Sequence, residues 1–204
     1  RSSFLYESLK NKYDTDILLI QDKHYSKEII EQHRQQKLYV INNTDSPFYF
    51  PNSVHDFLEE ELNAFKEILL QNQYDTIFFK FNSMAVLARF AKKILPFSNI
   101  IIDVDMLSSR ICYEAWKNKP TLKNRYFLLE YLKLNYFEKR FLNENFTYLY
   151  TNKTEMLKIK NTLTNKELHK HLPNVINEQQ NKGTCTYTKR FILFYGMLNS
   201  TVNQ

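Results

Sequence analysis

The stretch TIFFKFNSMAVLARFAKKILPFSNIIID, residues 76–103, contains the pattern that decides the fold. It begins and ends with two short strands, 76–80 and 99–103, whose side chains are mostly apolar. Residues 83–95 between them predict a helix, which Pro96 ends. Short apolar strands joined by helices are typical of a parallel sheet that is covered on both faces.

The same alternation extends in both directions along the chain. Further short strands are predicted at 16–20, 38–41, 146–150 and 170–172. Helices are predicted at 2–12, 23–36, 53–71, 106–116, 121–144 and 152–163. We therefore expect a doubly wound, Rossmann-like parallel sheet over residues 1–173. Ligands of such sheets bind at the carboxyl ends of the strands, so a site is expected in the loops after Ile20, Lys80, Asp103 and Tyr150.

Composition excludes several classes of function. The two glycines, Gly183 and Gly196, are too far apart for a Gly-rich phosphate loop. Cys112 and Cys185 show no metal-binding or disulfide spacing, which favours a reducing compartment. No apolar run approaches the roughly 20 residues of a membrane span. The net charge of +6 permits an anionic partner without selecting one.

The composition changes after Pro173. Residues 174–183 are mainly polar, and a new apolar strand follows at 190–196. A single strand cannot bury its own faces. We therefore expect 174–189 to be an interdomain linker and 190–204 to hold the first strand of a truncated second domain. The alternative is an extra edge strand on the first sheet.

Four segments together resemble a known family. They are 101–108, 136–138 with 146–155, 172–176, and 192–198 with Asn203. Residues 101–108 resemble an acidic loop, and 136–138 with 146–155 resemble a helix, a strand and a Ser-x-x-Glu turn. Residues 172–176 resemble an interdomain segment, and 192–198 with Asn203 resemble the opening strand of a nucleotide-sugar domain. The order and spacing of the four segments also match. These are features of retaining glycosyltransferases with the GT-B fold, in the group-1 (family 4) class, which includes bacterial surface-polysaccharide sugar transferases. The chain departs from the family pattern at Met106, Asn177 and 200–202.

The resemblance implies both a fold and an activity. Residues 1–173 would be the N-terminal, acceptor-binding half of a GT-B fold, and the family's first strand would precede Arg1. The donor domain would continue after Gln204, so this chain alone would be inactive. The full-length enzyme would transfer a sugar from a nucleotide-sugar to a glycan or lipid-linked acceptor with retention, without a metal or other cofactor. It would be cytoplasmic, at the inner face of the membrane.

Asp103 and Asp105 are the candidate catalytic residues. They flank Val104 at the end of a predicted strand, where alternation would place both carboxylates on one face. Such a pair could bind acceptor hydroxyls or act as a base, because two close carboxylates raise the pKa of one. The alternative is that one of them caps the following helix.

Other polar residues follow the same predicted strands. The candidate substrate-binding residues are Asn82, Ser83, Ser108, Ser109 and Arg110. Asn82, Ser83 and Ser108 could instead be helix N-caps, and Arg110 an ordinary surface side chain. The resemblance places the nucleotide-sugar at Gly196, Met197 and Asn199.

The remaining candidates lead to an alternative function. His24 and His55 are solitary, and His169 and His171 lack the neighbouring ligands of a metal site. The helix predicted at 121–144 mixes basic and aromatic residues, which suit an anionic membrane, RNA or simple packing on the sheet. The alternative function is therefore a non-catalytic basic α/β module that binds nucleic acid or an anionic membrane surface.

Overall fold

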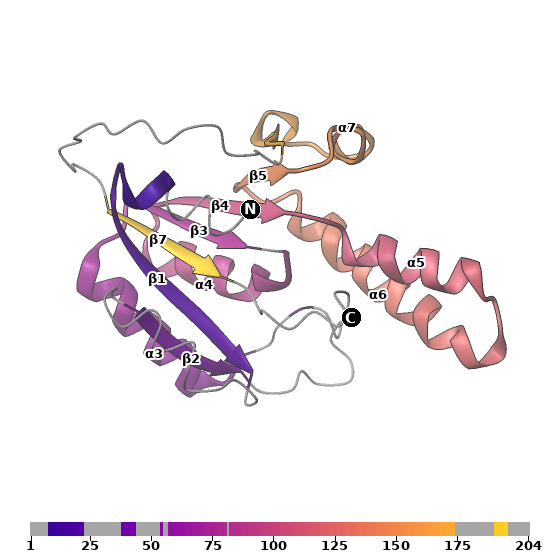
Figure 1. Ribbon diagram of the computed structural model, residues 1–204, viewed down its shortest axis with the longest axis horizontal. Coiled ribbons are helices and arrows are strands. Elements are labelled where there is room, and N and C mark those ends of the chain that lie inside the picture. The colour runs from indigo at the N-terminus through magenta and orange to yellow at the C-terminus, as the bar shows by residue number, and fades with distance from the viewer. Residues whose placement is uncertain are drawn as a thin grey trace.

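The computed structural model describes residues 8–22, 38–43, 54, 57–80, 82–173 and 190–195. These residues form a mixed α/β fold in which one parallel sheet is flanked by helices (Figure 1). The arrangement is compatible with the Rossmann-like sheet expected from the sequence. The helix predicted at 23–36 and the linker predicted at 174–189 lie outside the described residues.

Within the described residues the sheet contains seven strands in the order β2-β1-β7-β3-β4-β5-β6, and every neighbouring pair is parallel. The strands are β1 (Asp14–Asp22), β2 (Leu38–Asn43), β3 (Thr76–Lys80), β4 (Asn99–Val104), β5 (Thr147–Tyr150), β6 (His169–His171) and β7 (Arg190–Tyr195). Each strand predicted within residues 1–173 is therefore confirmed, because short apolar runs carry a strong local signal.

The unit formed by β3, α4 (Ala85–Ile94) and β4 supplies the centre of the core. Ile77 and Phe79 of β3 are fully buried, as are Leu87 and Ala91 of α4. Burying a large apolar side chain contributes about 1.5–3 kcal/mol. This unit therefore forms the rigid base from which the loops at the sheet edge extend.

Helix α3 (Glu59–Asn72) precedes this unit and begins later than predicted. The sequence predicted a helix over 53–71, whereas the N-cap of the observed helix is Leu58. The Glu61 carboxylate accepts a hydrogen bond from the Leu58 amide at 2.8 Å, which satisfies a donor at the start of the helix. Phe65 of α3 lies against Phe90 of α4, with ring centroids 6.2 Å apart.

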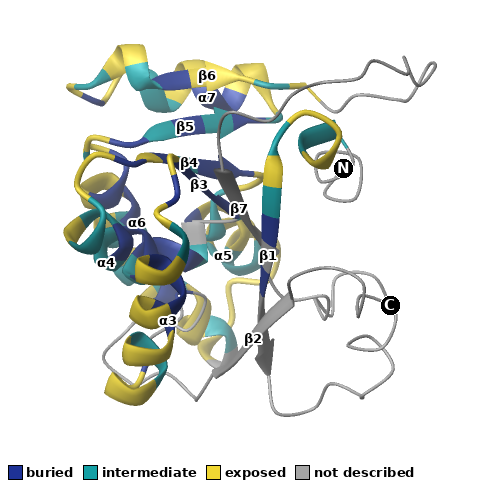
Figure 2. Ribbon diagram, turned by 90° about the vertical axis from the view of Figure 1, so that its left-hand side faces the viewer, coloured by how far each residue is buried: buried dark blue, intermediate teal, exposed yellow. Residues whose placement is uncertain are grey.

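Helices α3, α4 and α6 (Arg125–Phe141) lie on one side of the sheet (Figure 2). Right-handed crossovers explain this placement, because β3, β4 and β5 follow one another in a single direction across the sheet. The connections from β1 to β2 and from β6 to β7 run in the other direction. Most of their residues lie outside the described part of the chain, so the double winding itself stays a prediction.

Strand β7 occupies a position that the sequence analysis did not expect. It pairs with β1 on one side and with β3 on the other, so that Phe194 lies opposite both Leu18 and Phe79. The expectation that 190–204 opens a separate domain is corrected for 190–195, and these residues are not an edge strand either. An apolar strand suits a central position with covered faces, but its position in the sheet cannot be read from chain order.

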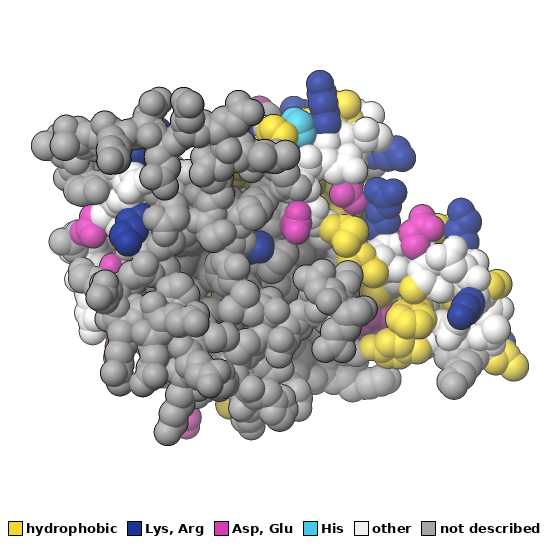
Figure 3. Space-filling view, in the orientation of Figure 1, with side chains coloured by type: hydrophobic (Ala, Val, Ile, Leu, Met, Phe, Trp, Pro, Cys, Tyr) yellow, Lys and Arg dark blue, Asp and Glu magenta, His cyan; other side chains and the backbone are white. Residues whose placement is uncertain are grey.

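Helices α5 (Ser108–Asn118) and α6 form an antiparallel hairpin that projects from the carboxyl end of β4 (Figure 1). The sequence predicted one helix over 121–144, and the structure has a short 3-10 turn, η2 (Leu122–Asn124), followed by α6. Hydrophobic side chains and charged side chains of both signs are visible on this hairpin (Figure 3).

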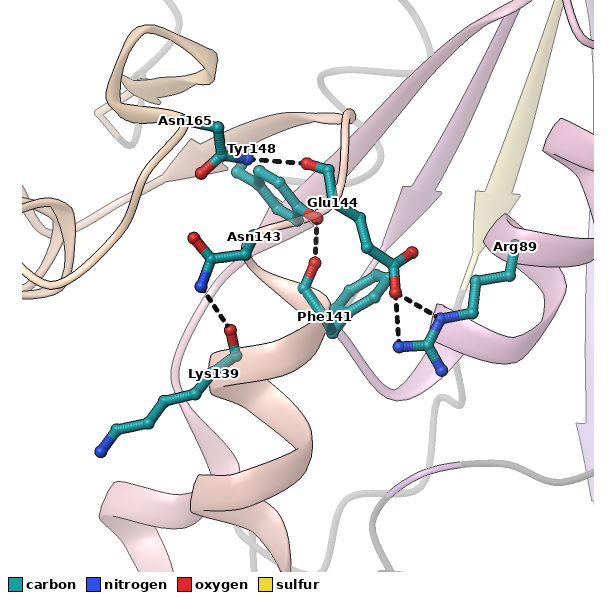
Figure 4. A network of polar contacts seen from close by, with 7 residues as sticks. All are labelled: Arg89, Lys139, Phe141, Asn143, Glu144, Tyr148 and Asn165. Carbon is teal, nitrogen blue, oxygen red and sulfur yellow. Dashed lines mark hydrogen bonds and ion pairs between the residues drawn. The ribbon is translucent and has the colours of Figure 1, made fainter.

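A network of polar contacts fixes the carboxyl end of α6 to the rest of the fold (Figure 4). Arg89 of α4 donates from Nε to Glu144 at 2.6 Å, and its guanidinium lies over the ring of Phe141. Asn165 donates to the Glu144 carbonyl at 2.7 Å, and the Tyr148 hydroxyl donates to the Phe141 carbonyl. These contacts fix where α6 leaves the sheet.

Candidate functional site

The carboxyl ends of β4 and β5 bring the candidate catalytic residues to one edge of the sheet. Asp103 is opposite Lys80 of β3 and Leu149 of β5, and Val104 is opposite Tyr150. This is the edge at which ligands of parallel α/β sheets bind. The backbone therefore places the acidic loop where the sequence analysis expected a site.

The two aspartates occupy different environments. Asp103 is fully buried within the sheet, whereas Asp105 is exposed. Strand β4 ends at Val104, so the alternation expected to place both carboxylates on one face does not extend to Asp105. The expected arrangement of the pair is therefore corrected: Asp105 is the one of the two that solvent reaches.

Asp105 is held by the neighbouring strand. The hydroxyl of Thr151, just after β5, donates to the Asp105 carbonyl at 3.0 Å and lies 3.4 Å from its Oδ1. The ring Nε2 of His171 lies 3.1 Å from the Thr151 carbonyl. Neither Thr151 nor His171 was predicted as part of this site, because the contacts depend on the pairing of strands far apart in the chain.

Ser109 is engaged inside the protein. Its amide donates to Glu138 Oε1 at 3.2 Å, and its hydroxyl donates to Glu138 Oε2. Both residues are buried. A carboxylate at the amino-terminal end of a helix satisfies a backbone donor and interacts favourably with the helix dipole. Glu138 of α6 therefore caps α5, whose N-cap residue is Leu107 and not an aspartate or a serine.

Arg110 and Glu155 form an ion pair beside this cap. The Arg110 guanidinium is about half exposed and lies 3.6 Å from Oε1 of the buried Glu155. Glu155 is in the first turn of α7 (Lys153–Lys160), where its amide donates to Asn152 Oδ1 at 3.1 Å. The Asn152-x-x-Glu155 spacing is the sequence signal of this turn, although Glu155 was not predicted as a site residue.

Tyr150 lies among these acidic groups. Burial raises the pKa of its hydroxyl, and the negative charges of Glu155 and Glu138 raise it further. Burial, Glu130 and Glu138 together raise the pKa of the Cys112 thiol to about 11. Both groups therefore stay protonated at neutral pH, so neither is an activated nucleophile.

His169 has a structural position behind Tyr150. Its Nδ1 lies 2.8 Å from the Tyr150 hydroxyl, and its Nε2 faces the Leu142 carbonyl at 3.0 Å and Asn165 Oδ1 at 3.2 Å. Because both partners of Nε2 are acceptors, this nitrogen carries the proton and the hydroxyl donates to Nδ1. Burial lowers the pKa of His169 to about 4, so the neutral ring is the stable form.

The other predicted site residues are only partly placed. Ser83 is half-buried in the 3-10 turn η1 (Asn82–Met84), and the same turn holds the backbone of Asn82. The N-cap of α4 is Met84, so neither predicted residue is the cap. Ser108 is half-buried at the start of α5. The residues that lie outside the described part of the chain are His24, His55, Gly196, Met197 and Asn199.

Within the described ranges, no group of three or more His, Cys, Asp or Glu side chains is positioned to bind a metal ion. The helices seen in those ranges are all too short or too polar to span a bilayer.

The site thus consists of an exposed carboxylate, a half-exposed guanidinium and buried acidic groups that hold the surrounding helices. Such a set can accept hydrogen bonds from hydroxyl groups at Asp105 and contact an anion at Arg110. Comparison of the chain with protein-family models, with curated proteins and with solved structures finds no match.

Proposed function

We propose that this chain is the acceptor-binding part of a retaining glycosyltransferase, which uses a nucleotide-sugar to extend a glycan or a lipid-linked acceptor. The observation that carries the proposal is the exposed Asp105 directly after the carboxyl end of β4, held by Thr151 directly after β5. The ordered resemblance over 101–108, 136–138 with 146–155, and 172–176 supports the same assignment.

Asp105 would accept hydrogen bonds from acceptor hydroxyls and orient the attacking oxygen. Arg110 would contact an anionic group of the acceptor, such as a lipid phosphate. Asp103, which is buried, would shape the loop without touching the substrate. The rate enhancement would come mainly from positioning and from stabilising charge on the leaving phosphate.

The decisive experiment measures sugar transfer by the natural gene product. Radiolabelled nucleotide-sugars are supplied with glycan and lipid-linked acceptors, and Asp105→Ala is compared with the unchanged protein. We expect transfer to fall at least tenfold. A matched control is Glu67→Ala, which removes an exposed carboxylate from α3. If neither Asp103→Ala nor Asp105→Ala lowers transfer tenfold, the acidic loop is not the site.

Acceptor binding can be measured on this chain directly. Saturation-transfer NMR with a panel of mono- and disaccharides would detect contact with sugar hydroxyls, and Asp105→Ala should abolish the signal that Glu67→Ala preserves. Nucleic-acid binding that falls steeply with salt, without any sugar contact, would instead support the non-catalytic basic module.

A further inference from the structure

The outer surface of α6 and of the turn before it exposes a row of large apolar side chains. Leu122 and Tyr136 are 73% and 70% exposed, and Leu129 and Leu132 are more than half exposed. Leu129, Leu132 and Tyr136 follow the i, i+3, i+7 spacing of one helix face. We call Leu122, Tyr126, Leu129, Leu132 and Tyr136 the α6 stripe; all five are exposed.

Charged side chains are divided between the two sides of α6. The outer side carries the exposed cations Arg125, Lys139 and Arg140. The two acidic residues of the helix, Glu130 and Glu138, are both buried. Glu138 accepts hydrogen bonds from Ser109 of α5, so it faces into the hairpin. The stripe is therefore bordered by positive charge, without an exposed carboxylate from α6.

Position in the fold makes this surface accessible. The hairpin projects beyond the sheet (Figure 1), and the face of it that Figure 3 shows carries hydrophobic side chains together with basic and acidic ones. The 17 residues of α6 extend about 25 Å, so the stripe can contact a flat surface along much of its length.

We propose that the α6 stripe docks this protein on the surface of an anionic lipid bilayer. The leucines would enter the boundary between headgroups and acyl chains, and the two tyrosines would lie at headgroup level. Arg125, Lys139 and Arg140 would extend to lipid phosphates while their alkyl stems pack on the stripe. The inference goes beyond the proposed function and does not rest on it.

Two other partners fit the same surface less well. In a second copy of this chain, the cations bordering the stripe would face one another and repel. Single-stranded RNA is bound by stacking of bases on aromatic rings, but the centre of the stripe is formed by Leu129 and Leu132. A bilayer is the surface that accepts both the leucines and the surrounding cations.

The test is cosedimentation of the full chain with two kinds of vesicle. One is made of phosphatidylcholine alone, and the other contains about 30% phosphatidylglycerol as the anionic lipid. We expect the anionic vesicles to bind at least tenfold more protein than the neutral ones. The double change Leu129→Ser with Leu132→Ser should lower binding at least tenfold, and Lys139→Gln with Arg140→Gln should remove the preference for anionic lipid.

The matched control is Leu70→Ser on α3, because Leu70 and Leu132 are exposed to nearly the same extent, 53% and 54%. This variant should bind vesicles as the unchanged protein does. Far-UV circular dichroism verifies that each variant is folded, and the charge variant carries the test if the leucine variant is not. Three results would overturn the inference. One is equal binding of the unchanged protein to both vesicle types, and another is unchanged binding by both the leucine variant and the charge variant. The third is a dimer in sedimentation that these variants make monomeric.

Discussion

The β3–α4–β4 unit and the α5–α6 hairpin lie next to each other but are stabilised in different ways. The first buries most of its large apolar side chains, including Ile77, Phe79 and Leu87. The second buries two carboxylates, Glu130 and Glu138, and exposes much of its apolar surface to solvent. A region that mainly stabilises the fold would instead bury its apolar side chains and expose its carboxylates. The distribution in the hairpin is the one that its proposed docking on a bilayer requires.

The internal contacts of the hairpin are correspondingly specific. Glu138 caps α5 through Ser109, and the Tyr113 ring lies 5.2 Å from that of Tyr131 across the two helices. Buried hydrogen-bonded carboxylates fix one arrangement of two helices, and aromatic pairs add a modest stabilisation. The hairpin can therefore hold its shape while its outer face stays apolar.

The largest effect should come from the core unit. Phe79→Ala removes a fully buried ring from the centre of β3 and should lower the free energy of unfolding by about 3–5 kcal/mol. Urea denaturation followed by circular dichroism measures the change. Phe97→Ala, which removes a ring that is 98% exposed, should leave the unfolding midpoint unchanged. Similar losses for the two variants would contradict the assignment of the core.

A smaller effect on stability is expected when the pH is lowered, because His169 lies at the contact between the end of α6 and the sheet. The pKa of His169 is about 4 in the fold and about 6.5 when unfolded, so the unfolded chain binds the proton more readily between these values. Stability should therefore fall by about 2 kcal/mol as the pH decreases from 6.5 to 4.

Unfolding curves at several pH values measure this loss in the unchanged protein and in His169→Asn. The variant should show a weaker pH dependence over the same range. His171→Asn, which changes an exposed histidine, is the control. An identical slope in all three proteins would mean that another group titrates.

Removing the carboxylate that caps α5 should lower the free energy of unfolding by less than Phe79→Ala does. Glu138→Ala leaves the buried amide and hydroxyl of Ser109 without their acceptor, which should cost about 1–3 kcal/mol. Hydrogen exchange should accelerate in α5 more than in β3. Glu114→Ala, at an exposed position of the same helix, is the comparison. Uniform acceleration would show that the hairpin and core unfold as one unit.

The smallest change in stability is expected on the outer face. Tyr136→Ser removes an exposed member of the α6 stripe and should shift the free energy of unfolding by no more than about 0.5 kcal/mol. Urea denaturation is again the measurement. A loss as large as that of Glu138→Ala would mean that Tyr136 packs within the fold, and the contrast between the two faces of α6 would be wrong.

Much of the framework could be predicted from local patterns. The strands at 76–80 and 99–103, the helix between them and the helix predicted at 152–163 all appear, the last as Lys153–Lys160. The candidate site was predicted less completely. Asp105 was located correctly at the sheet edge, but Thr151, Glu138 and Glu155 come from other elements. Their contacts with the acidic loop depend on strand pairing and helix packing.

The sequence by itself determined the order of helices and strands and the parallel α/β class, because hydrophobic periodicity and short apolar runs act within a few residues. Only the tertiary structure decided that β7 lies between β1 and β3, that β4 ends before Asp105, and that Glu138 caps α5. Each of these outcomes depends on contacts between residues far apart in the chain. Such contacts are selected by the burial and hydrogen bonding of the whole fold, so no local pattern specifies them.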